Sequence, residues 1–361
     1  MMLAIDWVWL LLALPAAFAL GWFFSRVDVW QWKLEARHQP RAYFKGLNHL
    51  LNGQQDRAVD SFIEAVQNDP DTCELHFTLG HLFRRRGEYD RAVRVHEHLL
   101  ARADMSSIDR ERAQFALAQD YAKAGFLDRA EAVIQGVGLN LAALHSREAQ
   151  QLLLSVYERG RDWLRANQLA EHMELSGLGS YTKRRAHYLC EQGLWEEAIA
   201  LAPSAPRAYL ALAEKKIAHG DVAAGHDLLA LAARYAPQAL SLLAQPLLQS
   251  ATTQEQRQVA IDGLVKAYAD SHSLDVLQAL IEAGWQDART AYAAHLAKEP
   301  SLVAASYLME SPETQLALSK ATEPLKRYRC AACGFGAKQY FWQCPGCQAW
   351  DSYPFKRVEE L

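Results

Sequence analysis

The sequence predicts an all-α fold with three parts: an N-terminal transmembrane helix, a superhelix of repeated helical hairpins and a small C-terminal metal-binding domain. Three observations support it. Residues 3–24 are almost continuously apolar, a pattern of small and aromatic residues recurs after 34 positions, and four cysteines fall within residues 330–347. Ala and Leu are abundant and runs of β-branched residues are scarce, which favours helices through the body of the chain.

Composition limits the classes of protein that remain. The chain has 361 residues, of which 50% are hydrophobic and 22% charged, so it is too long for one ordinary core and too apolar for disorder. The net charge of −4 argues against general nucleic-acid binding. The sequence has no P-loop, no G-x-G-x-x-G and no G-x-S-x-G motif, so we expect a protein that is not an enzyme.

Residues 1–25 are predicted to form a membrane anchor, followed by a juxtamembrane segment over residues 26–40. About twenty apolar residues cross the hydrocarbon core of a bilayer as a helix. A cleaved signal peptide is the alternative, because Ala17-Phe18-Ala19 could be a cleavage site, but no basic residue precedes the apolar run. Basic residues follow the run instead. The positive-inside rule therefore predicts a single-pass membrane protein with its bulk on the cytoplasmic side.

Residues 41–310 are predicted to form a solenoid of tetratricopeptide repeats. Gly46, Ala58, Phe62, Ala65 and Pro70 have the spacing of that repeat, with a small residue in the first helix and Ala, Phe, Ala and Pro along the second. The pattern restarts 34 residues later, at Gly80, and again near Ala118. Weaker copies follow around Leu154, Leu189 and Ala213 and near Tyr292, so the number of repeats is left open by one or two.

The remaining histidines and cysteines of the body are interpreted as packing residues. His76, His81, His96 and His98 lie in the second repeat, but His96-Glu97-His98 lacks the spacing that puts two metal ligands on one helix face. His96 also lies where the first repeat has Phe62. Cys73 and Cys190 fall in helical patterns and are expected to be small buried apolar residues.

After a predicted linker over residues 311–327, residues 328–361 contain the strongest chemical signal in the chain. Cys330, Cys333, Cys344 and Cys347 have the spacing C-x2-C-x10-C-x2-C, in which two turns each direct two thiolates at one metal ion. All four ligands come from the protein, so the site is structural rather than hydrolytic. The turns resemble rubredoxin knuckles, and tetrathiolate sites accept iron or zinc. Six aromatic residues should form a core around the metal and dock it on the last repeats: Tyr328, Phe335, Tyr340, Phe341, Trp342 and Trp350.

The chain resembles the lipopolysaccharide assembly protein B family of Gram-negative bacteria. The resemblance is carried by residues 42–60, by Leu79-Gly80-His81-Leu82-Phe83-Arg84, and by Tyr328-Arg329-Cys330 with Cys344-Pro345 and Ala349-Trp350. It implies an inner-membrane adaptor that regulates lipopolysaccharide synthesis by bringing the lipid A deacetylase LpxC to the membrane protease FtsH. It also implies an inner-membrane regulator that binds near the transmembrane helix, and carries over the four knuckle cysteines as metal ligands.

Two other functions remain open from the sequence. One is a general assembly platform for envelope-biogenesis enzymes that does not promote proteolysis. The other is a rubredoxin-like redox protein with a protein-docking body, although no flavin or partner redox motif occurs in the chain. A homodimer is among the oligomeric states that the sequence allows.

Overall fold

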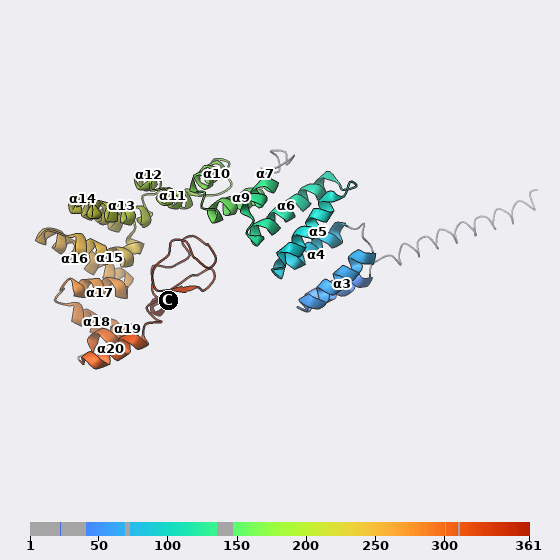
Figure 1. Cartoon of the computed structure of the whole chain (residues 1–361). Coiled ribbons are helices and arrows are strands. Elements are labelled where there is room, and N and C mark those ends of the chain that lie inside the picture. Colours follow the sequence, from blue (N-terminus) through green and yellow to red (C-terminus); the bar gives the residue numbers. More distant parts are fainter. Residues whose placement is uncertain (1–21, 23–40, 69–72, 136–146, 300, 310) are drawn as a thin grey trace, which may run out of the picture. The chain divides into compact units, whose positions relative to one another are not determined.

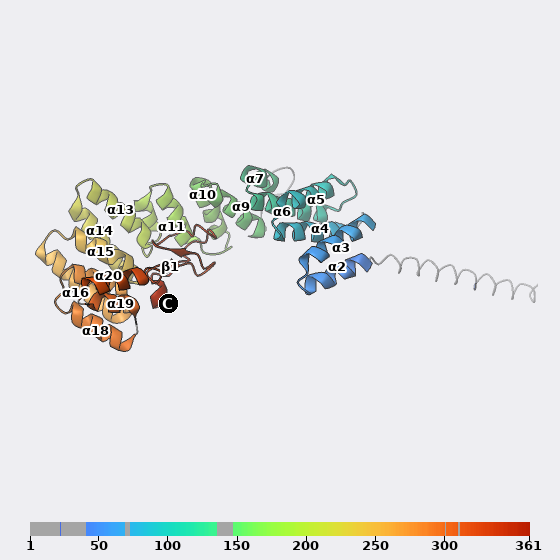
Figure 2. The same ribbon diagram turned by 60° about the horizontal axis from the view of Figure 1, so that its bottom comes forward.

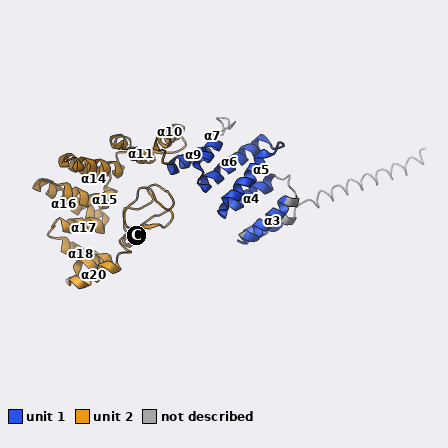
Figure 3. Ribbon diagram, viewed as in Figure 1, with its two compact units in different colours: residues 1–160 blue, residues 161–361 orange. Residues whose placement is uncertain are grey.

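The computed structural model describes residues 22, 41–68, 73–135, 147–299, 301–309 and 311–361 (Figure 1). It divides into two compact units, residues 1–160 and 161–361 (Figure 3). No helix within these described ranges is both long and apolar enough to cross a membrane. The predicted anchor, residues 1–25, and the juxtamembrane segment, residues 26–40, lie outside the described residues except for Trp22.

Unit 1 consists of antiparallel helical hairpins. Its described helices are α2 (Arg41–Leu51), α3 (Gln55–Asn68), α4 (Cys73–Arg85), α5 (Tyr89–Ala101), α6 (Ser107–Ala124), α7 (Leu127–Gln135) and α9 (Arg147–Arg159). Small residues let the paired helices approach closely. A Cβ atom on Gly46 would lie 3.0 Å from the ring of Phe62, which is itself fully buried. Ala58 and Ala65 are fully buried beside it, as the tetratricopeptide spacing predicts.

The turns between paired helices repeat as well. Five glycines with a positive φ angle each lie seven residues after a small crossing residue or its equivalent: Gly53, Gly87, Gly125, Gly193 and Gly220. Arg161 takes the same place after Leu154 with φ of 56°. A left-handed residue there ends the first helix and lets the second fold back on it.

Unit 2 continues the hairpins and ends in a small irregular domain. Its helices are α10 (Trp163–Leu175), α11 (Thr182–Glu191), α12 (Trp195–Leu201), α13 (Pro206–Ala218), α14 (Val222–Tyr235), the 3₁₀ turn η1 (Pro237–Ala239), α15 (Leu240–Ser250), α16 (Gln254–Ser271), α17 (Leu274–Glu282), α18 (Ala288–Lys298), α19 (Leu302–Leu308) and α20 (Pro312–Ala321). The helix α20 lies inside the segment predicted as a linker, and none of its residues is buried.

The C-terminal domain of unit 2 has two short antiparallel strands, β1 (Tyr328–Arg329) and β2 (Gly336–Ala337), and a final 3₁₀ turn, η2 (Val358–Glu360). It lies on the inner side of the curve formed by the helices of unit 2 (Figures 1 and 2). The all-α repeat architecture with an appended small domain is therefore confirmed for the described part of the chain.

Candidate metal centre

Four cysteine sulfurs converge at one point of the C-terminal domain. The Sγ atoms of Cys330, Cys333, Cys344 and Cys347 all lie within 4.8 Å of one another. The Sγ atoms of Cys330 and Cys347 are 3.8 Å apart, and those of Cys333 and Cys344 are 3.7 Å apart. Sulfurs bound tetrahedrally to zinc at about 2.3 Å are separated by about 3.8 Å. The spacing of the four sulfurs therefore fits a tetrathiolate site.

The two C-x-x-C turns have the same backbone geometry. In the first, the N–H of Gly334 donates to the carbonyl of Cys330 at 2.8 Å, and the N–H of Cys330 donates to Phe335. In the second, the N–H of Gln348 donates to the carbonyl of Cys344 at 2.8 Å. The residue after each second cysteine has a positive φ, 79° at Gly334 and 61° at Gln348. This repeated turn aims both thiols of each motif, and nearby N–H groups, at the same centre.

The electrostatics of the four thiols favour a cation at their centre. Burial by itself raises the pKa of Cys330. Hydrogen bonds from Ser352 and from backbone N–H groups outweigh this effect and lower the pKa to about 6. A hydrogen bond from the N–H of Phe335 lowers the pKa of Cys333. Burial and the neighbouring sulfurs outweigh this effect and raise the pKa to about 12. Four adjacent thiolates repel one another, so all four become ionised together only when a metal ion compensates their charge.

The burial of the site is uneven. Cys330 and Cys344 are each 1% exposed, whereas Cys333 and Cys347 are exposed. The hydroxyl of the buried Tyr353 lies 3.8 Å from the Sγ atom of Cys344 and donates to the carbonyl of Phe335. Tyr353 and Ser352 could not be predicted as neighbours of the sulfurs, because neither belongs to the cysteine pattern. They come close to the sulfurs of Cys330 and Cys344 only because the chain folds back after the second C-x-x-C turn.

The predicted aromatic core forms in part. Tyr328 is 2% exposed and packs with Tyr340 and Phe341. Phe335 was expected in the same core but is 43% exposed, so that prediction was wrong. Its ring covers Gly346, where a Cβ atom would lie 3.2 Å away, and it therefore shields the second cysteine turn rather than the domain's core.

The domain is docked on the first helices of unit 2 as well as on the last ones. Trp350 stacks on His187 of α11 with ring centroids 4.8 Å apart, and its edge meets Trp163 and Tyr188. The Nε2 atom of His187 lies 2.9 Å from a carboxylate oxygen of Asp351. The sequence predicted docking against the last repeats only, because His187 and Asp351 are 164 residues apart and no local pattern links them.

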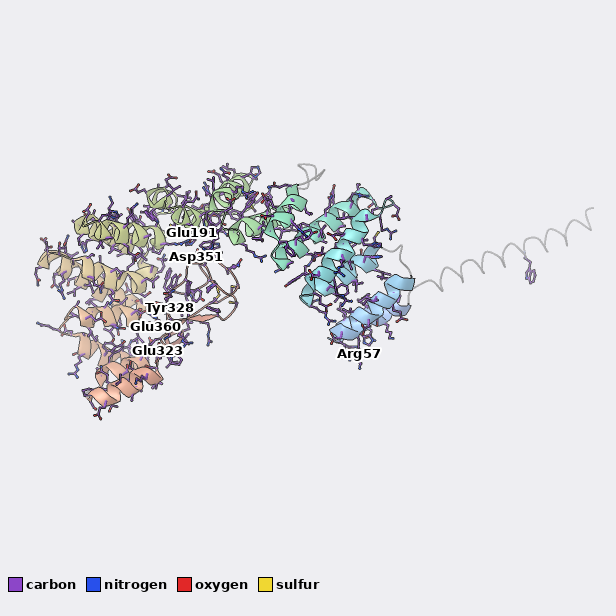
Figure 4. The ribbon with its side chains drawn as sticks, viewed as in Figure 1. Arg57, Glu191, Glu323, Tyr328, Asp351 and Glu360 are labelled. Carbon is purple, nitrogen blue, oxygen red and sulfur yellow. The ribbon has the colours of Figure 1, made fainter. Side chains whose placement is uncertain are left out.

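The end of the chain holds the other side of the domain. The guanidinium of Arg357 donates to Asp275 of α17 at 2.8 Å and lies over the ring of Tyr328. Glu360 accepts the N–H of Leu274, and Glu359 accepts the N–H groups of Leu302 and Val303. These carboxylates satisfy the free donors at the N-termini of α17 and α19, where negative charge is favourable. Figure 4 shows Asp351, Tyr328 and Glu360 on the inner side of the helices of unit 2.

The histidines of the second repeat do not form a similar site. His96 is fully buried against Gly80, and its Nδ1 atom pairs with Asp120, which also accepts from Arg84. His76 is buried and stacks on the exposed His98. Cys190 is buried, and burial raises the pKa of its thiol to about 11, while Cys73 is partly buried. The packing interpretation is therefore confirmed for His96, but no local pattern indicated its buried partner Asp120.

These features define a class: a tetratricopeptide-repeat protein that carries a rubredoxin-type four-cysteine domain. A model of the rubredoxin metal binding domain matches residues 328–353. Lipopolysaccharide assembly protein B of Escherichia coli K12 is 30% identical over 98% of this chain and 99% of its own length. The protein of the same name from Haemophilus influenzae is 27% identical over 95% of this chain and 96% of its own. The chain belongs to the lipopolysaccharide assembly protein B family.

Among solved structures, a tetratricopeptide repeat protein from Parabacteroides merdae covers 67% of this chain and 97% of its own, with 16% identity and a TM-score of 0.36.

Proposed function

We propose that this chain is a non-catalytic adaptor in lipopolysaccharide assembly, held at the inner membrane with its repeats on the cytoplasmic side. Family membership supports the pathway, since the relatives are named for lipopolysaccharide assembly. In this role the chain presents the lipid A deacetylase LpxC to the membrane protease FtsH and lowers the level of the deacetylase. An inner-membrane regulator acts on it near the transmembrane helix.

The observation that carries the proposal is the way the cysteine centre is built into the repeats. All four candidate ligands, Cys330, Cys333, Cys344 and Cys347, come from the chain itself, so a metal there has no open position for a substrate. The domain is held at both ends, by His187 and by Asp275. We propose these four cysteines as ligands of one iron or zinc ion that fixes the shape of a protein-docking surface.

The half-life of the deacetylase in cells tests this function. With the full chain present we expect rapid loss of the deacetylase that depends on the protease, and slow loss without the chain. A version without residues 1–25 should lose this effect while remaining folded. An unchanged deacetylase half-life on removing the chain rejects the adaptor role and favours the general assembly platform.

A rubredoxin-like redox protein is the second candidate, favoured by the match of residues 328–353 to a rubredoxin metal binding domain. Purified full chain should then contain iron with a reversible one-electron potential. Zinc-loaded protein that still controls the deacetylase half-life rejects this candidate, because zinc has no redox chemistry at such a site.

A further inference from the structure

One position of the repeat serves as a docking position within this chain. In four of the described hairpins a small residue of the first helix lies seven residues before the left-handed turn residue: Gly46, Gly80, Ala118 and Ala186. The next residue along each helix is Leu47, His81, Gln119 and His187, respectively. These four residues are therefore equivalent in their hairpins, three in unit 1 and one in unit 2.

In unit 2 this position is occupied by another part of the same chain. The ring of Trp350 stacks on His187 with an interplanar angle of 18°, and the carboxylate of the next residue, Asp351, reaches His187 Nε2. Arg207 adds a cation 5.8 Å from the centre of the Trp350 ring. The repeat surface thus recognises an aromatic side chain followed directly by a carboxylate, with a histidine and an arginine as the receiving groups.

In unit 1 two of the three equivalent positions are exposed and the third, Gln119, is half-buried. Leu47 is 36% exposed, and His81 is also exposed. The residues four positions further along the same helices are exposed too: Leu51 on α2 at 79%, Arg85 on α4 and Lys123 on α6. We define the docking face of unit 1 as Leu47, Leu51, His81, Arg85, Gln119 and Lys123.

Contacts between helices show that α4 and α6 contribute to one continuous surface. Arg112 of α6 donates two hydrogen bonds to the carboxylate of Glu74 of α4, and its guanidinium lies 4.2 Å from the centre of the Phe77 ring. Glu74 and Arg112 each lie six residues before the small crossing residue of their helix. Equivalent residues of adjacent repeats are therefore neighbours, as stacking of a solenoid requires.

The α4 and α6 part of this face is electropositive. Arg112 is paired with Glu74 and Arg84 with Asp120, whereas Arg85 and Lys123 form no ion pair with any described residue. The face therefore combines apolar side chains on α2 with uncompensated positive charge on α4 and α6.

We propose that the docking face of unit 1 binds a segment of a partner protein in which an acidic residue stands beside a bulky apolar residue. The proposal rests on the adaptor role and names the chemistry by which the adaptor recognises its client. Trp350 and Asp351 are the internal example of such a segment on the equivalent position of unit 2. The exposed leucines receive the apolar side chain, and Arg85 and Lys123 attract the carboxylate.

A fluorescein-labelled peptide, Gly-Ser-Gly-Trp-Asp-Glu-Gly-Ser, tests the face by fluorescence anisotropy with the full chain in detergent micelles. Arg85→Glu combined with Lys123→Glu should weaken binding on the order of tenfold or more, and Leu51→Ser should also weaken it. The matched control is Arg57→Glu with Arg94→Glu, the same change of charge at exposed residues on the second helices of two hairpins. The control should bind within about twofold of the unmodified chain.

Three results overturn the proposal. The first is equal binding of a peptide with Asn and Gln in place of Asp and Glu. The second is equal loss of binding in the docking-face and control variants. The third is a signal that follows association of the chain with itself, which assigns the face to a second copy.

The deacetylase half-life separates this inference from the adaptor role. Docking-face variants that lose peptide binding yet still accelerate loss of the deacetylase overturn the inference and leave the adaptor role standing. Peptide binding that behaves as predicted, with a half-life independent of the chain, supports the face and rejects the adaptor role.

Discussion

Asp120 joins three helices of unit 1 through a buried polar cluster, and we predict that Asp120→Ala loosens all three. One carboxylate oxygen accepts from Arg84 of α4 at 2.8 Å, and the other lies 2.5 Å from Nδ1 of His96 on α5. The side chains of Asp120 and His96 are 0% exposed, and that of Arg84 is 15% exposed. Water therefore cannot replace the lost carboxylate.

The expected loss follows from this burial. Removing one partner of a buried pair typically costs about 3–5 kcal/mol, because the remaining charged and polar groups stay desolvated. Asp56→Ala is the matched control, since Asp56 also pairs with an arginine, Arg86, at 2.9 Å, but its side chain is 86% exposed. An exposed pair of this kind contributes about 0–1 kcal/mol.

Hydrogen exchange of the full chain in detergent micelles, read by mass spectrometry, measures the two variants region by region. In Asp120→Ala the most protected amides of α4, α5 and α6 should exchange about two to four orders of magnitude faster, since each tenfold change is about 1.4 kcal/mol. Asp56→Ala should change them by less than about tenfold. An Asp120→Ala variant whose protection matches that of Asp56→Ala refutes the reasoning.

Three further variants test other contacts. Cys330→Ser should unfold residues 328–361, because metal binding and folding of such domains are coupled; unchanged protease resistance of this segment contradicts it. Gly80→Ala should destabilise unit 1 by about 1–3 kcal/mol in the same exchange experiment, because the new Cβ atom would lie 2.5 Å from the His96 ring. Full protection of α4 and α5 in this variant would show instead that the ring moves freely. Trp350→Ala should weaken docking of the metal domain by about 2 kcal/mol or more and should speed hydrogen exchange in α11. The control is Lys338→Ala, a change at an exposed residue of the same domain. Equal exchange in both variants would assign the docking to the Asp275 side alone.

Local repetition explains why much of the fold could be predicted. The spacing of Gly46, Ala58 and Phe62 results from close packing between two helices that are adjacent in the chain. Because every repeat needs the same contacts, the same residue types recur in the sequence at a short, regular interval. The cysteine spacing is equally local, because each turn is completed within five residues, as the hydrogen bond from Gly334 to Cys330 shows. The number of repeats after residue 200 stays open from the sequence, because their spacing there is irregular.

The exceptions are residues whose partners come from another helix or another turn of the chain. His96 occupies a position where the first repeat has Phe62, so its packing role could be predicted, but its partner Asp120 is 24 residues away on another hairpin. Phe335 was misplaced for a related reason: its environment depends on Gly346, which approaches only after the second cysteine turn closes.

The sequence by itself determined the helical repeats, the four converging cysteines and the family, since each depends on residues close together in the chain or on overall similarity. Only the tertiary structure decided where the metal domain lies on unit 2, with Asp351 on His187 and Glu359 at the start of α19. Those contacts join positions 164 and 57 residues apart. No periodic pattern marks such pairs, because the helices between them, rather than the local chain, bring the partners together.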